Sequence, residues 1–179
     1  ASSARRSDSR AATRATSSKR VAIWRSTDAG QSWEKTLAPA NNHTFKPGDK
    51  ILLQGEPVAR PLMIAAYREV IRAGGLPFVL WDDPDMQEIL IKEGSDDQLA
   101  YMPEPVEVAF STCRASIFIT GTDNTRTLSS ADPARQQLAS RAEAGLARTI
   151  QQRVASGEFT FVVTMFPTPA YAQEANMSL

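Results

Sequence analysis

Four short apolar runs dominate the chain from residue 46 onward: residues 51–55, 76–81, 115–120 and 159–166. Each run is continuously apolar instead of alternating between apolar and polar residues, which is typical of strands that are buried on both faces. Segments with helical spacing of apolar residues separate the runs. This order predicts an α/β fold, with a mostly parallel sheet of about four strands and helices on both faces.

The first expected helices lie between these strands and have recognisable ends. Residues 58–73 carry apolar side chains every three to four positions, and the pair Gly74-Gly75 predicts where this helix ends. Three acidic residues, Asp82, Asp83 and Asp85, lead into the next helix, where they are ordinary partners of a helix dipole. Further helical pieces are expected at residues 86–92, 96–101 and 105–112.

The longest expected helix begins with Asp132 as its N-cap and Pro133 at its first position, and it continues to Gly157. Apolar residues at every fourth position form the stripe expected to be buried: Leu138, Ala142, Leu146, Ile150 and Val154. Four arginines spread around the helix predict a solvated surface and not a nucleic-acid stripe: Arg135, Arg141, Arg148 and Arg153.

The first 42 residues differ in composition from the rest. Residues 1–20 hold six Arg or Lys and one Asp, a net charge of +5, and no large apolar residue, so we expect a disordered basic tail. Residues 21–42 are expected to form a short hairpin and a linker. Its turn, STDAGQSW at residues 26–33, resembles the Asp-box of sialidase-type β-propellers. The expected division is therefore 1–20, 21–42 and an α/β domain at 43–179.

Composition and motifs exclude several functions. No apolar run is long enough to cross a bilayer, and the single cysteine, Cys113, cannot form an internal disulfide, so cytoplasm is the simplest location. The only histidine, His43, lies in the linker, which argues against a histidine-based metal site or a serine or cysteine nucleophile with a histidine base. No glycine-rich phosphate loop is present. We therefore assign no catalytic, metal-binding or cofactor-binding residue and expect no nucleic-acid or membrane partner.

The carboxyl ends of parallel strands meet at one edge of the sheet, where α/β proteins usually bind ligands. The loop at residues 121–130, with sequence GTDNTRTLSS, lies on that edge, and we expect it to be a connection and not a catalytic loop. The candidates for a substrate chamber or a domain interface follow the four strands: Glu56, Asp82, Asp123, Asn124, Arg126, Thr168 and Tyr171.

Three segments carry a family resemblance: KPGDKILLQGEPVARPLMIAAYREVIRAGG, GTDNTRTLSSADPARQ and FVVTMFPTPAYAQEANMSL. In order and spacing, residues 45–179 resemble the amino-terminal domain of metal-dependent aminopeptidases of the aminopeptidase T and aminopeptidase S type. The resemblance implies a cytosolic homodimer that removes single amino-terminal residues from peptides with two divalent ions, such as zinc or cobalt. It also implies that the metal ligands lie in a carboxy-terminal domain, at positions outside this chain.

Three functions follow as hypotheses. The first is the non-catalytic domain of such an aminopeptidase, truncated before the catalytic domain, which would wall the active-site cavity and be inactive alone. The second is a stand-alone α/β module that binds a ligand or partner at the strand-end edge. The third, a sialidase-like glycan-binding fragment, depends on the octet at residues 26–33 alone.

Overall fold

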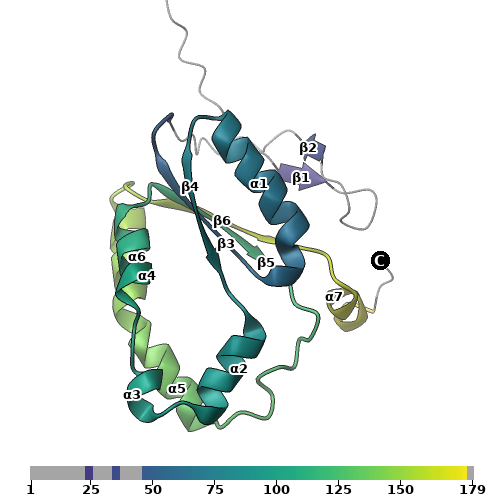
Figure 1. The fold of residues 1–179 in the computed structure, drawn as a ribbon, viewed down its shortest axis with the longest axis vertical. Helices are drawn as coiled ribbons and strands as arrows, with labels where there is room; N and C mark the ends of the chain where they lie inside the picture. The colour runs from purple at the N-terminus through teal and green to yellow at the C-terminus, as the bar shows by residue number, and fades with distance from the viewer. Residues whose placement is uncertain (1–22, 26–33, 37–45, 177–179) are drawn as a thin grey trace, which may run out of the picture.

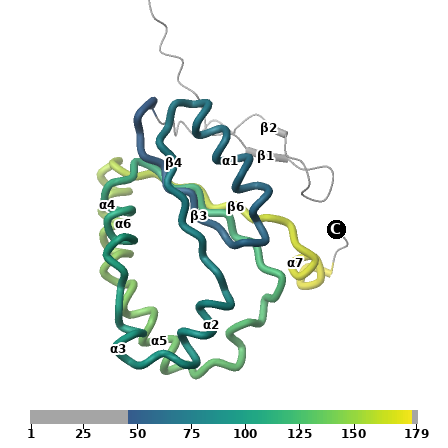
Figure 2. Tube along the Cα trace, viewed as in Figure 1, coloured from purple at the N-terminus to yellow at the C-terminus, as the bar shows by residue number. Residues whose placement is uncertain are grey.

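The computed structural model describes residues 23–25, 34–36 and 46–176. Its main sheet has the strand order β4-β3-β5-β6, and every neighbouring pair is parallel (Figures 1 and 2). The α/β fold expected from the sequence is therefore confirmed. The strands are β3 (Lys50–Gly55), β4 (Leu76–Trp81), β5 (Ala115–Thr120) and β6 (Thr160–Met165).

Two further strands, β1 (Ile23–Arg25) and β2 (Glu34–Thr36), pair antiparallel, with Ile23 opposite Thr36. This pairing confirms the two expected strands of the hairpin. The Asp-box-like turn at residues 26–33 and the basic tail at residues 1–20 lie outside the described residues.

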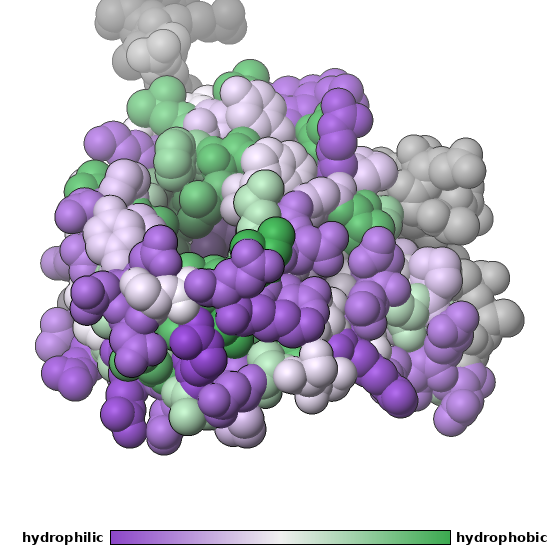
Figure 3. All heavy atoms as spheres, turned by 60° about the horizontal axis from the view of Figure 1, so that its bottom comes forward, coloured by the Kyte–Doolittle hydropathy of each residue, from purple (hydrophilic) through white to green (hydrophobic). Residues whose placement is uncertain are grey.

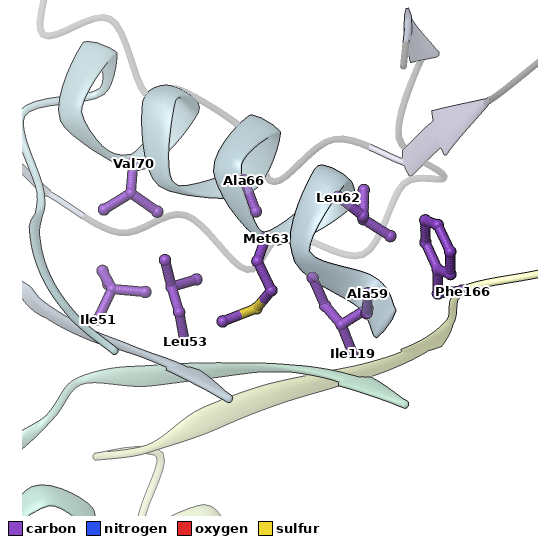
Figure 4. Packing of buried hydrophobic residues seen from close by; sticks show 9 residues of the cluster. All are labelled: Ile51, Leu53, Ala59, Leu62, Met63, Ala66, Val70, Ile119 and Phe166. Carbon is purple, nitrogen blue, oxygen red and sulfur yellow. The ribbon is translucent and has the colours of Figure 1, made fainter. Parts of the chain in front are cut away.

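One face of the sheet is covered by α1 (Arg60–Arg72), which follows a short 3-10 turn, η1 (Pro57–Ala59). The helix turns its apolar side toward the residues of β3 that point to this face (Figure 4). After the C-cap, Gly74 has a positive φ of 82°, which allows the next residue, Gly75, to donate its N–H to the carbonyl of Val70 at 2.9 Å. The buried cluster here comprises Ile51, Leu53, Ala59, Leu62, Met63, Ala66, Val70, Ile119 and Phe166.

The opposite face is covered by α4 (Glu104–Thr112) and α6 (Ala144–Ala155), so helices lie on both faces as expected (Figure 1). Leu52 points to this side and is fully buried. The rings of Phe110 and Phe159 meet edge to face, with centroids 6.0 Å apart. The central strand β3 thus contributes to both cores.

A third group of helices lies beyond the carboxyl ends of the strands: α2 (Pro84–Glu93), α3 (Asp96–Leu99) and α5 (Pro133–Ala142). Their shared core is small and is built on Ile91, Leu99 and Ala131. Asp83 is the N-cap of α2 and accepts an N–H from Asp85 at 3.0 Å, a role more specific than the helix-dipole partner expected from the sequence. Figure 3 brings this end forward, and hydrophilic side chains dominate it below a hollow bordered by hydrophobic residues.

The single long helix expected at residues 132–157 is wrong, because the structure divides it into α5 and α6 at Glu143. The two halves have different partners: α5 packs with α2 and α3, whereas α6 packs with α4. Consequently the expected stripe is not continuous. Leu138 joins the third cluster, Leu146 and Ile150 join the core behind β3, and Val154 is exposed.

The solvated surface expected for the arginines is also wrong for Arg135 and Arg153. Arg153 donates to the carbonyls of Phe110 and Cys113 at the end of α4 and lies 5.5 Å from the ring centre of Phe159. Arg135 donates in the same way to the carbonyls of Ile91 and Gly94 at the end of α2. The last carbonyls of a helix have no partner within it, so each arginine completes the end of a neighbouring helix.

We predict that Leu62→Ala lowers the free energy of unfolding by about 2–5 kcal/mol, because Leu62 is 2% exposed between α1 and the sheet. Ile64→Ala on the same helix, where the side chain is 43% exposed, should change it by less than about 1 kcal/mol. Urea unfolding followed by circular dichroism measures both values. Equal losses would show that α1 does not pack as described.

We also predict that Arg153→Met destabilises the chain by about 1–3 kcal/mol, because two helix-end carbonyls lose their donor. Arg148→Met, at an exposed position of the same helix, is the matched control and should be nearly neutral. The same unfolding measurement compares them. A neutral Arg153→Met would mean that water satisfies these carbonyls equally well.

Candidate functional site

The strand order places a topological switch point between β3 and β5, because β3 leads to β4 on one side and β5 leads to β6 on the other. Glu56 follows β3 directly, and Gly121 follows β5. A Cβ at Gly121 would lie 3.1 Å from Cβ of Phe166 and 3.2 Å from Cγ1 of Val58. Glycine therefore lets the loop after β5 start tightly against the segment that carries Glu56.

Glu56 is one of two acids at this switch point whose pKa is raised. Burial raises the pKa of its carboxyl above the usual 4.5, and the charges of Asp82, Asp123 and Asp83 raise it further. A hydrogen bond with the backbone of Gly121 opposes this rise. Among the described residues, the buried Oε2 of Glu56 has no hydrogen-bond partner. A desolvated carboxyl facing other carboxylates is a common feature of functional sites.

Asp82, at the end of β4, is the second perturbed acid. Burial raises the pKa of its carboxyl, and the charge of Asp83 acts in the same direction. Its Oδ1 accepts a hydrogen bond from Nε2 of Gln87 at 2.5 Å, which opposes the rise. Glu56 and Asp82 therefore form an acidic group at the carboxyl ends of β3 and β4.

The loop at residues 121–130 is held by its own polar side chains. Oγ1 of Thr122 accepts the N–H of Asn124 at 3.1 Å, and Oδ1 of Asn124 accepts the N–H of Arg126 at 3.0 Å. Thr127 closes the turn by donating to the carbonyl of Asn124 at 3.0 Å. The loop thus has a defined conformation that presents Asp123 and Arg126 beside a short helix near the carboxyl end of the chain.

This helix is α7 (Pro169–Glu174), which the sequence analysis did not predict. Its signals were present: Thr168 is the N-cap and accepts the N–H of Tyr171 at 3.3 Å, and Pro169 occupies the first helical position. Glu174 joins the helix to the loop, because its Oε1 accepts a hydrogen bond from Thr125 at 2.7 Å and lies 4.0 Å from Nε of Arg126.

A cavity of about 450 Å³ lies between this loop and α7. Its lining carries both signs of charge and suits a polar ligand. The residues that line it are Asp123, Asn124, Thr125, Arg126, Ala170, Gln173 and Glu174.

The structure therefore divides the seven candidates into three sets. Asp123, Asn124 and Arg126 line the cavity. Glu56 and Asp82 belong to the acidic group. Thr168 and Tyr171 form the cap of α7 and do not line the cavity, although Thr168 is buried. The sequence analysis missed three lining residues with polar side chains: Thr125, Gln173 and Glu174.

The described residues do not supply a metal centre. Within 23–25, 34–36 and 46–176, no group of three or more His, Cys, Asp or Glu side chains is arranged to hold an ion. The acidic group at the switch point has no imidazole or thiolate among its members. In the same residues, no helix is both long and apolar enough to cross a membrane.

Comparison with known proteins identifies the family. A sequence model described as "Thermophilic metalloprotease (M29)" matches residues 35–179. The chain belongs to this family. The match includes the segments that carry the aminopeptidase resemblance, which is thereby confirmed, and it begins after the octet at residues 26–33. M29 proteins are metalloproteases, so the family uses metal ions and acts on peptides.

A solved structure described as "Wild-type AmpT from Thermus thermophilus" has a similar fold, with a TM-score of 0.61 at 17% sequence identity. The aligned part covers 72% of this chain and 34% of that protein. The M29 chain therefore spans about a third of the length of this neighbour. No curated protein sequence matches it.

We predict that Glu56→Gln stabilises this M29 chain at neutral pH. A folded pKa above the unfolded one means that the charged carboxylate destabilises the fold above the folded pKa, and that this cost vanishes below the unfolded pKa. The melting temperature of Glu56→Gln should thus exceed that of the parent at pH 7. The difference should shrink toward zero as the pH falls below the usual pKa of 4.5.

Glu93→Gln, at an exposed position of α2, is the control and should show little difference from the parent at any pH. Differential scanning calorimetry across this pH range measures all three proteins. If Glu56→Gln were less stable than the parent at pH 7, the hydrogen bond with Gly121 would outweigh the cost of burying the carboxylate.

Proposed function

We propose that this chain is the non-catalytic α/β domain of a metal-dependent aminopeptidase, with a role in walling the active-site cavity. The single observation that carries the proposal is the M29 match over residues 35–179. Since the solved neighbour is about three times as long as the aligned part, a longer family chain has room for a separate catalytic domain.

The whole enzyme, in this proposal, is a cytoplasmic homodimer that removes amino-terminal residues from peptides. Two divalent ions, zinc or cobalt, would be held by the separate catalytic domain, where they would supply the Lewis-acid chemistry for peptide hydrolysis. The present chain supplies no ligand to those ions. In this proposal the acidic group of Glu56 and Asp82 and the charged cavity beside α7 would face the substrate chamber or the catalytic domain.

A second candidate is a stand-alone binding module. It is favoured by the cavity of about 450 Å³, which lies at the end of the sheet where α/β proteins bind ligands. In that case Arg126 would pair with a ligand carboxylate or phosphate. Its side chain is 81% exposed, and its ion pair with Glu174 is long, at 4.0 Å.

We predict that the 179-residue chain hydrolyses no peptide and retains no stoichiometric zinc or cobalt. A two-ion centre requires several carboxylate and imidazole ligands that converge within a few ångströms. A chain extended by the family's remaining sequence should be an aminopeptidase. Both proteins are incubated with excess metal, freed of unbound ions, analysed by mass spectrometry, and assayed on one peptide with a free and with an acetylated amino terminus.

The acetylated peptide is the control for amino-terminal specificity. Chelator-sensitive cleavage of the free peptide by the 179-residue chain would contradict the non-catalytic role. If the extended chain stayed inactive with every metal while the short chain bound a small anion through Arg126, the stand-alone module would be favoured instead.

A further inference from the structure

The cavity between the loop at residues 121–130 and α7 is lined by two charged groups that the fold does not use. The carboxylate of Asp123 has no hydrogen bond or ion pair within the part of the chain that the structure describes. Arg126 approaches Glu174 through Nε, at 4.0 Å, and no described residue pairs with its two terminal nitrogens. The cavity therefore offers one carboxylate and one guanidinium group to a ligand.

Other polar groups of the same lining are engaged with one another. Oδ1 of Asn124 accepts the N–H of Arg126, and Thr125 donates its hydroxyl to Glu174 on α7. These bonds hold the loop against α7, which lies beside it in Figure 2. The backbone that carries Asp123 and Arg126 is thus fixed before a ligand binds, and this reduces the ordering cost of binding.

The charges of the lining restrict the class of ligand. One guanidinium group, that of Arg126, stands against the two carboxylates of Asp123 and Glu174, so the lining has a net charge of −1. A phosphate dianion would pair with Arg126 but would be repelled by both carboxylates. A lone ammonium group would leave the guanidinium unused. A ligand that carries one ammonium group and one carboxylate pairs with both unused groups.

The size and polarity of the cavity favour a small ligand of this class. Its volume of about 450 Å³ is within the range of sites that hold small molecules. Ala170 is the only apolar residue of the lining, so a large apolar side chain of a ligand would gain little there. The fit therefore depends on the two charged ends of the ligand.

We propose that this cavity binds a small zwitterion, a free α-amino acid or a short peptide, with its carboxylate at Arg126 and its ammonium group at Asp123. The amide of Gln173, which lines the cavity as well, adds a donor for the carboxylate. The inference narrows the ligand of the stand-alone module and shares its cavity. It holds equally for a domain of a longer enzyme and does not depend on peptidase activity.

NMR titration of the isotope-labelled 179-residue chain with alanine tests the proposal. We expect shifts of the amides at residues 123–126 and at Gln173, with a dissociation constant on the order of 1 mM. N-acetylalanine lacks the ammonium group and alaninamide lacks the carboxylate. Each should bind about tenfold more weakly than alanine, because each loses one charged contact. Inorganic phosphate at the same ionic strength should not compete.

Two variants assign the ends of the ligand. Arg126→Gln should remove the difference between alanine and alaninamide, and Asp123→Asn should remove the difference between alanine and N-acetylalanine. Arg141→Gln on α5 and Glu107→Gln on α4, at exposed positions, are the matched controls and should bind alanine like the parent. The dispersion of each spectrum checks that the variant folds.

The outcomes are distinct. Tighter binding of alanine than of alanylalanine identifies a free amino acid as the ligand, the reverse order identifies a short peptide, and either supports the site. No shifts at residues 123–126 with either compound up to about 20 mM would overturn the proposal. Phosphate or N-acetylalanine binding as tightly as alanine would overturn it too, as would unchanged alanine binding by Arg126→Gln. Peptidase activity of an extended chain is a separate readout, so its failure would count only against the proposed function.

Discussion

The burial of β3 on both faces is the constraint on which the rest of the structure depends. Ile51, Leu52 and Leu53 are consecutive and each is fully buried. Because side chains alternate along a strand, Ile51 and Leu53 require a cover on one face and Leu52 requires another on the opposite face. A single layer of helices covers only one face of the sheet. Burial of these residues therefore requires both α1 on one face and the pair α4 and α6 on the other. The same strand pairs with β4 and β5 and thereby creates the switch point.

The strands could be predicted from the sequence because their signal is local. Four continuous apolar runs gave four parallel strands, with boundaries close to those observed. The division at Glu143 could not be predicted in this way, since the apolar repeat continues across it. What divides the helix is the choice of partners, which are distant in sequence. The hydrogen bonds of Arg135 and Arg153 could not be predicted for the same reason. Each arginine donates to carbonyls at the end of a helix that is distant in sequence, so the contact depends on how the helices pack.

The candidate site shows a similar limit. Its position at the carboxyl ends of the strands follows from the topology, and three predicted residues, Asp123, Asn124 and Arg126, do line the cavity. The contribution of Glu174 could not be predicted, because it depends on α7 folding back beside the loop and accepting a hydrogen bond from Thr125. Thr168 was selected for its position, yet its hydroxyl group caps α7. Topology therefore predicts the location of the site more reliably than the role of each side chain.

The acidic group and the cavity are linked through the start of the loop. Gly121 contacts the Glu56 carboxylate through its backbone, and two residues later the loop presents Asp123, whose charge raises the pKa of Glu56. A positive charge bound beside Asp123 would lower that pKa and favour the ionised form of Glu56. The charges that raise the pKa of Glu56 thus belong to residues that follow other strands: Asp82 and Asp83 after β4, and Asp123 after β5.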